Sequence, residues 1–246
     1  MNGRLFSALL GVGLLVAAME AVGRLGLAGE ALPPLSQIIG DASEPGMRRI
    51  LGRAVGATLE SSVRGLLIGT VAALVLGAVG HLVVQLRTGL DRLSVLVASL
   101  PLPALGPLFI ASFGAKGTPT MIAALGAGFA MFVAGTAGLL SVSAAQQDVF
   151  TALGSTRRAR LRLLEIPTAI PWFLDGLALG GPAAVLGATI GEWFGAPRGL
   201  GVLVVSALQN VQTTLLWAAA LAITLLSLVA YAVPAMLGGI AVRRFR

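Results

Sequence analysis

Long continuous runs of apolar residues, separated by short polar stretches, follow one another along the whole chain. A helix that crosses a bilayer needs about 20 mostly apolar residues, and six runs approach or exceed that length. These six predicted spans cover approximately residues 5–22, 59–84, 93–113, 118–140, 170–194 and 215–240. Because the runs are continuous and do not alternate with polar residues, they predict transmembrane α-helices rather than strands of a barrel.

The polar stretches between the spans predict shorter elements outside the hydrocarbon region. Residues 47–55 are expected to form a separate surface helix, and residues 195–212 are expected to lie across one membrane face. The prolines Pro101, Pro103 and Pro107 are expected to break the third span, because proline lacks an amide donor. No internal repeat is visible. The pattern therefore predicts an all-α, polytopic membrane protein whose residues 1–246 form one domain.

The composition supports this fold class. Of the 246 residues, 57% are hydrophobic and 11% are charged, whereas a soluble globular chain carries about 25% charged residues. Mean hydropathy is +0.93. A soluble enzyme, a secreted disulfide scaffold and a disordered chain are all excluded on these grounds, and the absence of cysteine rules out disulfides and thiolate metal sites.

The basic residues predict an orientation. The formal net charge is +7, which in a membrane protein indicates basic cytoplasmic loops facing anionic lipid and partner subunits rather than nucleic acid. We place both termini in the cytoplasm. This puts most of the basic residues inside, namely Arg4, Arg87, Arg92, Arg157, Arg158, Arg160, Arg162, Arg243, Arg244 and Arg246. The cluster Arg48, Arg49 and Arg53 argues against this topology.

The predicted cytoplasmic loop of residues 141–168, called here the projecting loop, carries the most informative pattern. Asp148–Leu153 fits a short helix with an apolar patch formed by Val149, Phe150 and Leu153. Gly154 can end that helix in a left-handed cap, and Ser155 or Thr156 can cap a second, arginine-rich helix. Pro167 suits the first turn of the fifth span. We expect a rigid pair of helices outside the membrane.

This loop resembles that of the binding-protein-dependent permeases of ABC importers. Their loop reads Glu-Ala-Ala, three residues, Gly, nine residues, Ile-x-Leu-Pro. Gly154 matches the glycine, and Leu164, Ile166 and Pro167 match the final motif, while Asp148, Val149 and Phe150 replace Glu-Ala-Ala. Glu192-Trp-Phe-Gly-Ala-Pro-Arg-Gly-Leu-Gly201 is similar to a segment of the nitrate, sulfonate and taurine subgroup. The proline-rich third span, with Pro101, Pro107, Phe109, Phe113 and Gly114, is similar to that subgroup as well.

The resemblance implies the type I permease fold and an importer in the bacterial inner membrane. Two permeases, this chain with a second copy or a paralogue, would assemble with two cytoplasmic ABC ATPases and an extracytoplasmic substrate-binding protein. The chain itself would bind no cofactor and would not be an enzyme, since no Gly-x4-Gly-Lys-Ser/Thr motif occurs; ATP and Mg would be used by the ATPase. The substrate would be a small anion, a sulfonate or an aromatic or pyrimidine-like nutrient. The residues implied in ATPase coupling are Asp148, Val149, Phe150, Leu153, Gly154, Arg157, Arg158 and Pro167.

Several intramembrane residues are candidates for the substrate path, because buried charge and broken backbone in a bilayer are costly. They are Arg64, Pro101, Pro107, Phe109, Asp175 and Glu192. For Arg64 we favour the alternative of an i, i+4 ion pair with Glu60 over a role in the path, and for Glu192 we favour the alternative of an interface anchor. His81, the only histidine, is expected to be a polar residue at a span end.

Two other functions remain open. A secondary carrier would bind substrate and a coupling ion at midplane residues of a repeated fold, and no repeat is visible. A lipid-active membrane enzyme would need a cluster of His, Asp or Ser, and the sequence offers none. For the projecting loop alone, a basic helix that binds anionic lipid is the alternative.

Overall fold

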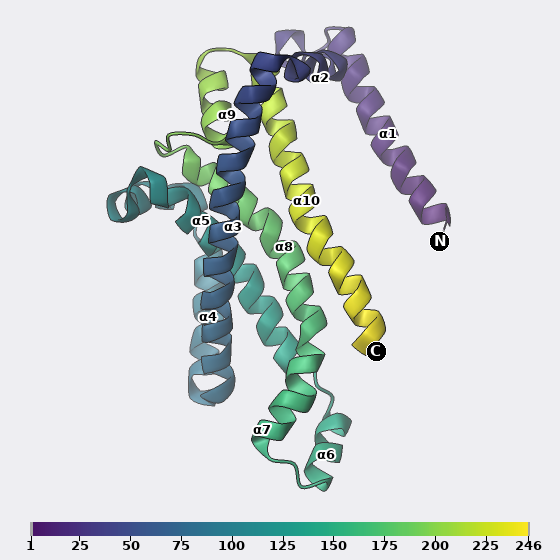
Figure 1. Cartoon of the computed structure of the whole chain (residues 1–246), viewed down its shortest axis with the longest axis vertical. Helices are drawn as coiled ribbons and strands as arrows, with labels where there is room; N and C mark the ends of the chain where they lie inside the picture. Colours follow the sequence, from purple (N-terminus) through teal and green to yellow (C-terminus); the bar gives the residue numbers. More distant parts are fainter. Residues whose placement is uncertain (1, 246) are drawn as a thin grey trace.

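Six long helices, joined by short ones, build the architecture (Figure 1). This computed structural model describes residues 2–245, with the side chains of residues 6, 7, 10–83, 85–97 and 99–240. The described backbone is helical and contains no strand, which confirms the predicted all-α fold. The long helices are α1 (Asn2–Arg24), α3 (Pro45–Leu82), α4 (Val84–Ser99), α5 (Gly106–Leu140), α8 (Ile166–Glu192) and α10 (Thr213–Phe245).

The short helices gather at the two ends of the bundle. At one end lie α2 (Leu35–Ser43) and α9 (Leu200–Gln209), and at the other lie α6 (Ala144–Ala152) and α7 (Arg157–Arg160) (Figure 1). The 3-10 turns are η1 (Gly29–Ala31) and η2 (Leu102–Leu105), and a π-helical turn, η3 (Leu161–Glu165), joins α7 to α8. The start of α1 and the end of α10 point toward the end that carries α6 and α7.

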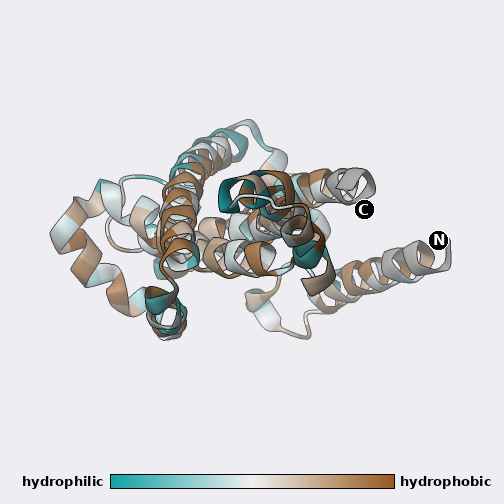
Figure 2. Cartoon of the chain, turned by 90° about the horizontal axis from the view of Figure 1, so that it is seen from below, coloured by the Kyte–Doolittle hydropathy of each residue, from teal (hydrophilic) through white to brown (hydrophobic). Residues whose placement is uncertain are grey.

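Among the described residues, four helical stretches are long and apolar enough to cross a membrane. They are Pro45–Leu82, Leu102–Leu140, Arg157–Glu192 and Thr213–Ile240. The 23-residue α1 coincides with the first predicted span. Large apolar side chains face outward, for example Leu67 and Leu225, which are 61% and 62% exposed. Hydrophobic residues cover much of the long helices in the view from the α6 and α7 end (Figure 2), as expected of surfaces that meet lipid.

The third predicted span, residues 93–113, is wrong as a single helix. The α4 helix has only 16 residues and ends at Ser99. Leu100 is extended, with φ −74° and ψ 127°, because a residue before proline avoids the helical region. The chain then passes through η2, starts α5 at Gly106 and changes direction at Gly114, where φ is +69°. The break predicted from Pro101 is thus confirmed, whereas the continuous span is not.

A second correction concerns the polar stretch before the second span. Residues 47–55 do not form a separate helix but are the first turns of α3, which starts at Pro45 and continues to Leu82. Proline suits the first turn of a helix because it needs no amide donor there. The cluster Arg48, Arg49 and Arg53 therefore lies at the end of the bundle remote from α6 and α7. The side chains of Arg4, Arg243, Arg244 and Arg246 lie outside the described residues.

Small residues hold the long helices together. Ala123 and Ala127 of α5 pack against Ala184 and Ala188 of α8. At Gly187, a Cβ atom would stand 2.8 Å from the Ile122 carbonyl oxygen, so only glycine allows this approach. Apolar side chains gain little by leaving lipid for protein, so close backbone contact provides the packing.

The glycines of α5 differ in what they contact. Gly126, Gly128 and Gly138 lie against Ala183, Gly69 and Trp172, respectively, so the helices pack closely at these three positions. At Gly135, by contrast, a Cβ atom would meet nothing within 4 Å. That position faces open space.

Candidate coupling site in the projecting loop

The first half of the projecting loop is a capped helix that ends at a glycine. The Ser143 hydroxyl accepts a hydrogen bond from Gln146 N, and Gln146 Oε1 accepts one from Ser143 N, which together form a capping box at the start of α6. Gly154 has φ +67°, a conformation that side chains with a Cβ rarely adopt. The Ser155 amide donates to the Phe150 carbonyl at 3.0 Å. The predicted left-handed cap at Gly154 is confirmed.

The second half of the loop continues into the bilayer as one helical rod. The Thr156 hydroxyl accepts a hydrogen bond from Ala159 N and caps α7, one of the two predicted caps. From Arg157 the backbone stays helical through η3 and α8 to Glu192. Pro167 provides a reason for the widened turn of η3, because its ring crowds the carbonyl four residues earlier. The second half of the loop and the fifth predicted span therefore form one continuous helix.

The tip of the loop presents apolar side chains to its surroundings. Val149 is 56% exposed and Leu153 is 78% exposed, whereas Phe150 is half-buried. Asp148 and Arg158 are exposed beside them. This tip extends beyond the ends of the other long helices (Figure 1). An apolar patch on a projecting, basic element is the kind of surface that packs into a groove of a partner.

A buried carboxylate joins the loop to the end of α3. Glu165, in η3, is 8% exposed. Its Oε2 lies 2.9 Å from His81 Nε2, and its Oε1 accepts a hydrogen bond from Arg160 Nε at 3.1 Å. From the sequence, His81 is expected only to be a polar residue at a span end, and Glu165 is not among the expected site residues. The one signal available was an acidic residue within an arginine-rich stretch.

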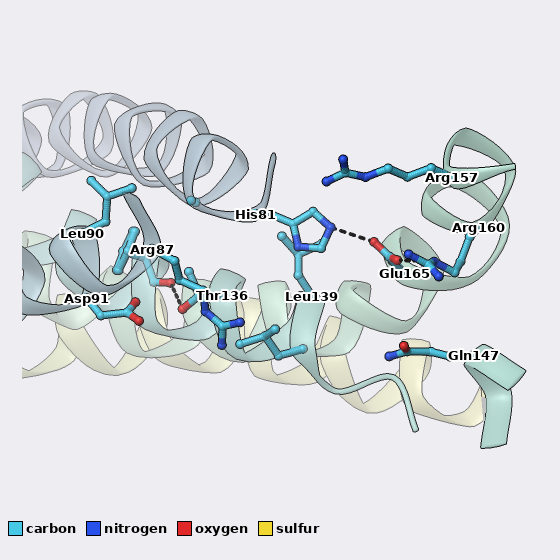
Figure 3. A pocket seen from close by; sticks show the side chains of 14 residues that line it. His81, Arg87, Leu90, Asp91, Thr136, Leu139, Gln147, Arg157, Arg160 and Glu165 are labelled. Atoms are coloured by element: carbon cyan, nitrogen blue, oxygen red, sulfur yellow. Dashed lines mark hydrogen bonds and ion pairs between the residues drawn. The ribbon is translucent and has the colours of Figure 1, made fainter. Parts of the chain in front are cut away.

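A polar cavity of about 410 Å³ opens beside this carboxylate (Figure 3). It lies between the turn from α3 to α4, the end of α5 and the projecting loop. Arg157, assigned to ATPase coupling in the sequence analysis, lines this cavity together with Arg87 and Arg160. Arg158 does not line it, so the structure separates the two adjacent arginines.

At the opposite end of α8, Glu192 holds the start of α9. This residue is 2% exposed, and its carboxylate accepts hydrogen bonds from Thr58 Oγ1 at 2.8 Å and from Gly201 N at 2.7 Å. Thr58 Oγ1 in turn accepts one from Leu200 N at 2.8 Å. Side chains at Gly199 would collide with Glu192. The segment that resembles the subgroup motif therefore wraps a buried carboxylate.

The remaining path candidates do not converge on one site. Arg64 forms an ion pair with Glu60 at 2.7 Å on the exposed face of α3, which is the arrangement favoured from the sequence. Phe109 lies 5.7 Å from Phe113, centroid to centroid, and lines an apolar cavity of about 300 Å³ between α3, α4 and α5. Pro101 and Pro107 are exposed at the break before α5.

Asp175 is exposed on α8, near Gly238 of α10. Among the residues whose side chains are described, no three His, Asp or Glu gather as a metal-binding group.

Comparison with known proteins decides the family. Residues 65–246 match the model of the binding-protein-dependent transport system inner membrane component. The chain belongs to this family. The permease is 34% identical over 139 residues to the formylaminopyrimidine transport permease ThiX of Halalkalibacterium halodurans, a match that covers 54% of the chain and 56% of ThiX. It therefore spans little more than half the length of that relative.

Two further comparisons extend over most of the chain. A protein of Haemophilus influenzae, named "Probable ABC transporter permease protein", is 28% identical over 232 residues, which are 94% of each protein. The fold is similar to a chain of the MetNI methionine ABC transporter in an inward-facing conformation, with a TM-score of 0.67 at 16% identity, covering 80% of this chain and 99% of the other. The fold and the role of ABC importer permease predicted from the sequence are both confirmed.

Proposed function

We propose that the projecting loop is the handle by which a separate cytoplasmic ATPase moves this permease. The observation that carries the proposal is the unbroken helical path from Arg157 to Glu192, next to an exposed apolar patch at the loop tip. A helix of 36 residues is about 54 Å long at 1.5 Å per residue. A partner that grips the tip therefore acts on a lever that reaches the far end of the bundle.

The motion follows from how this lever is packed. ATP-driven closure of two ATPases moves the tip, and α8 tilts with it because only the short capped turn of residues 153–156 separates the tip from α7, which is continuous with α8. The backbone of α8 contacts α5 at Gly187 and at Gly191, so a tilt of α8 shifts the α5–α8 seam as a unit. Rocking of rigid, packed helices is a known class of switch. The substrate path opens alternately to the two sides.

This mechanism implies an orientation of the chain in the membrane and a set of partner subunits. The loop end faces the cytoplasm of a bacterial cell, and both termini lie on that side. Two permeases, this chain with a second copy or a paralogue, form the path, and an extracytoplasmic binding protein delivers substrate. ATP and Mg act in the partner ATPase, and this chain performs no hydrolysis. Residues 1–246 act as one membrane domain, with residues 141–168 as its coupling loop.

The substrate belongs to the class of small anions, sulfonates and aromatic or pyrimidine-like nutrients. The resemblance of residues 192–201 to the nitrate, sulfonate and taurine subgroup supports this range, and the name of ThiX refers to a formylaminopyrimidine. The ligand that copurifies with the adjacent binding protein tests the assignment. A sugar or a metal ion in that protein would contradict it.

The coupling role is tested by placing a charge on the loop tip. Leu153→Glu puts a carboxylate into the proposed contact, and Thr151→Glu adds the same charge on the opposite face of α6. Substrate-stimulated ATP hydrolysis by the reconstituted complex should fall about tenfold or more in Leu153→Glu, the size expected at a central contact residue, and should stay near wild type in Thr151→Glu. Gly154→Glu should behave like Leu153→Glu.

The opposite outcome has a clear meaning. If both Leu153→Glu and Gly154→Glu retain stimulated hydrolysis, the loop is not the handle. If the permease purifies in mild detergent without any ATP-binding protein, yet still transports after reconstitution, a secondary carrier is the correct function.

A further inference from the structure

Two hollows of opposite character adjoin at the loop end of the bundle. The polar cavity of about 410 Å³ lies beside Glu165. An apolar groove of about 470 Å³ runs between α3, α5 and the start of α8. Gly77, His81 and Leu139 line both of them, so the polar cavity and the groove are direct neighbours.

The polar cavity contains uncompensated basic groups. Arg160 is paired with Glu165, but Arg87 and Arg157 form no ion pair or side-chain hydrogen bond with any residue whose side chain the structure describes. Figure 3 shows Arg157 reaching in from the loop and Arg87 entering from α4. Asp91 is the other carboxylate of the lining. The three arginines outnumber the two carboxylates, so the cavity favours an anion.

The groove, in contrast, has almost no polar lining. Its walls include Leu74, Leu82, Ile166 and Phe173. Gly135 borders open space beside it, because a Cβ atom at this position would meet nothing within 4 Å. An apolar hollow of this size at the side of a membrane helix bundle suits a hydrocarbon chain.

We propose that this composite site binds one anionic phospholipid, with its phosphate between Arg87 and Arg157 and an acyl chain in the groove. Basic pockets between membrane helices on the cytoplasmic side bind anionic head groups. A soluble phosphate would use only the cavity, and a zwitterionic lipid would bring no net charge to it. The bound lipid links α4 to the projecting loop through its two arginines, and so supports the loop at the base of the proposed handle.

Binding is measured on the full-length permease in detergent by native mass spectrometry. The protein is titrated with phosphatidylglycerol, with phosphatidylcholine of the same chains, and with glycerol 1-phosphate, which carries the phosphate without chains. We expect one phosphatidylglycerol to be retained per chain, about 30-fold more tightly than phosphatidylcholine, since two arginines act on its charge.

Two pairs of variants locate the site. The double variant Arg87→Gln/Arg157→Gln should lose the preference for phosphatidylglycerol. The control double variant Arg92→Gln/Arg162→Gln removes the same charge from exposed positions outside the cavity and should keep that preference. Gly135→Leu should weaken binding of phosphatidylglycerol by filling the groove, and Gly135→Ala should not. Both residues are better helix formers than glycine, so neither change weakens α5.

Each other outcome overturns the proposal. Equal loss in the two arginine pairs means a diffuse basic surface. Equal binding of glycerol 1-phosphate means a site for a soluble phosphate. Wild-type binding in Gly135→Leu means that no chain enters the groove, as would follow if a protein segment covers it. These measurements need no ATPase, so their failure leaves the proposed coupling function standing.

Discussion

Glu165 and His81 form a contact of 2.9 Å that ties the projecting loop to the last turn of α3. Glu165 belongs to η3, directly before α8, and is almost fully buried. A force on the loop therefore reaches two long helices, α8 through the backbone and α3 through this carboxylate. The contact places the only histidine of the chain at the base of the proposed handle.

This tie predicts that His81 affects both stability and coupling. His81→Ala leaves Glu165 with Arg160 alone and should lower the free energy of unfolding by about 1–2 kcal/mol. It should also reduce the substrate transported per ATP. His81→Gln keeps a donor and should lose less of both. Thermal unfolding and transport in vesicles provide the measurements, and unchanged values for His81→Ala would show that α3 takes no part.

The cost of a substitution at Gly154 is predicted to depend on the backbone conformation that the new residue tolerates and not on its size. The φ of Gly154 is +67°, yet a Cβ atom there would meet nothing within 4 Å. Asparagine tolerates this conformation, whereas a β-branched residue does not. Gly154→Val should therefore cost about 1–2 kcal/mol and open the end of α6 to hydrogen exchange, while Gly154→Asn stays close to wild type. Equal effects of the two variants would contradict a left-handed requirement.

Removal of the Thr58 hydroxyl alone is predicted to lower the stability of the protein strongly. This hydroxyl donates to Glu192 and accepts from Leu200 N, so it connects α3, α8 and α9. Thr58→Val keeps the shape but leaves Leu200 N and the Oε1 atom of Glu192 without a partner, and should cost about 2–4 kcal/mol. Thr58→Ser keeps the hydroxyl and should cost less. Faster amide exchange at Leu200 and Gly201 in Thr58→Val alone would confirm the role; equal exchange in both variants would exclude it.

Variants of Arg64 and Glu60 distinguish a structural role of Arg64 from a role in the substrate path. If the pair is structural, Arg64→Gln leaves an unpaired carboxylate, and adding Glu60→Gln should restore transport to near the wild-type rate. If Arg64 binds an anionic substrate, the double variant should remain inactive. We expect the first result, since the two side chains are 2.7 Å apart. Uptake of substrate at saturating ATP measures it.

Local chemistry explains what the sequence predicted correctly. The apolar runs, the helix ending at Gly154, the cap at Thr156 and the break at Pro101 each depend on a few neighbouring residues. Their residue types restrict backbone angles or burial directly. The family resemblance rested on the same local motifs. Even so, local reasoning counted residues 93–113 as one span despite its predicted break, and it separated residues 47–55 from α3, because an apolar or polar run does not show which neighbouring segments share one helix.

The sequence by itself determined that this chain is a bundle of membrane helices with a basic loop whose first helix ends at a glycine cap, since a bilayer and a backbone impose those patterns residue by residue. Only the tertiary structure decided which partners meet. The hydrogen bond between Thr58 and Glu192 spans 134 positions, and the residues near either one in the sequence do not predict the other as its partner. The same holds for His81 with Glu165 and for the separation of Arg157 from Arg158. Such contacts follow from how glycine and alanine let helices approach, which is a property of the packed bundle and not of any single segment.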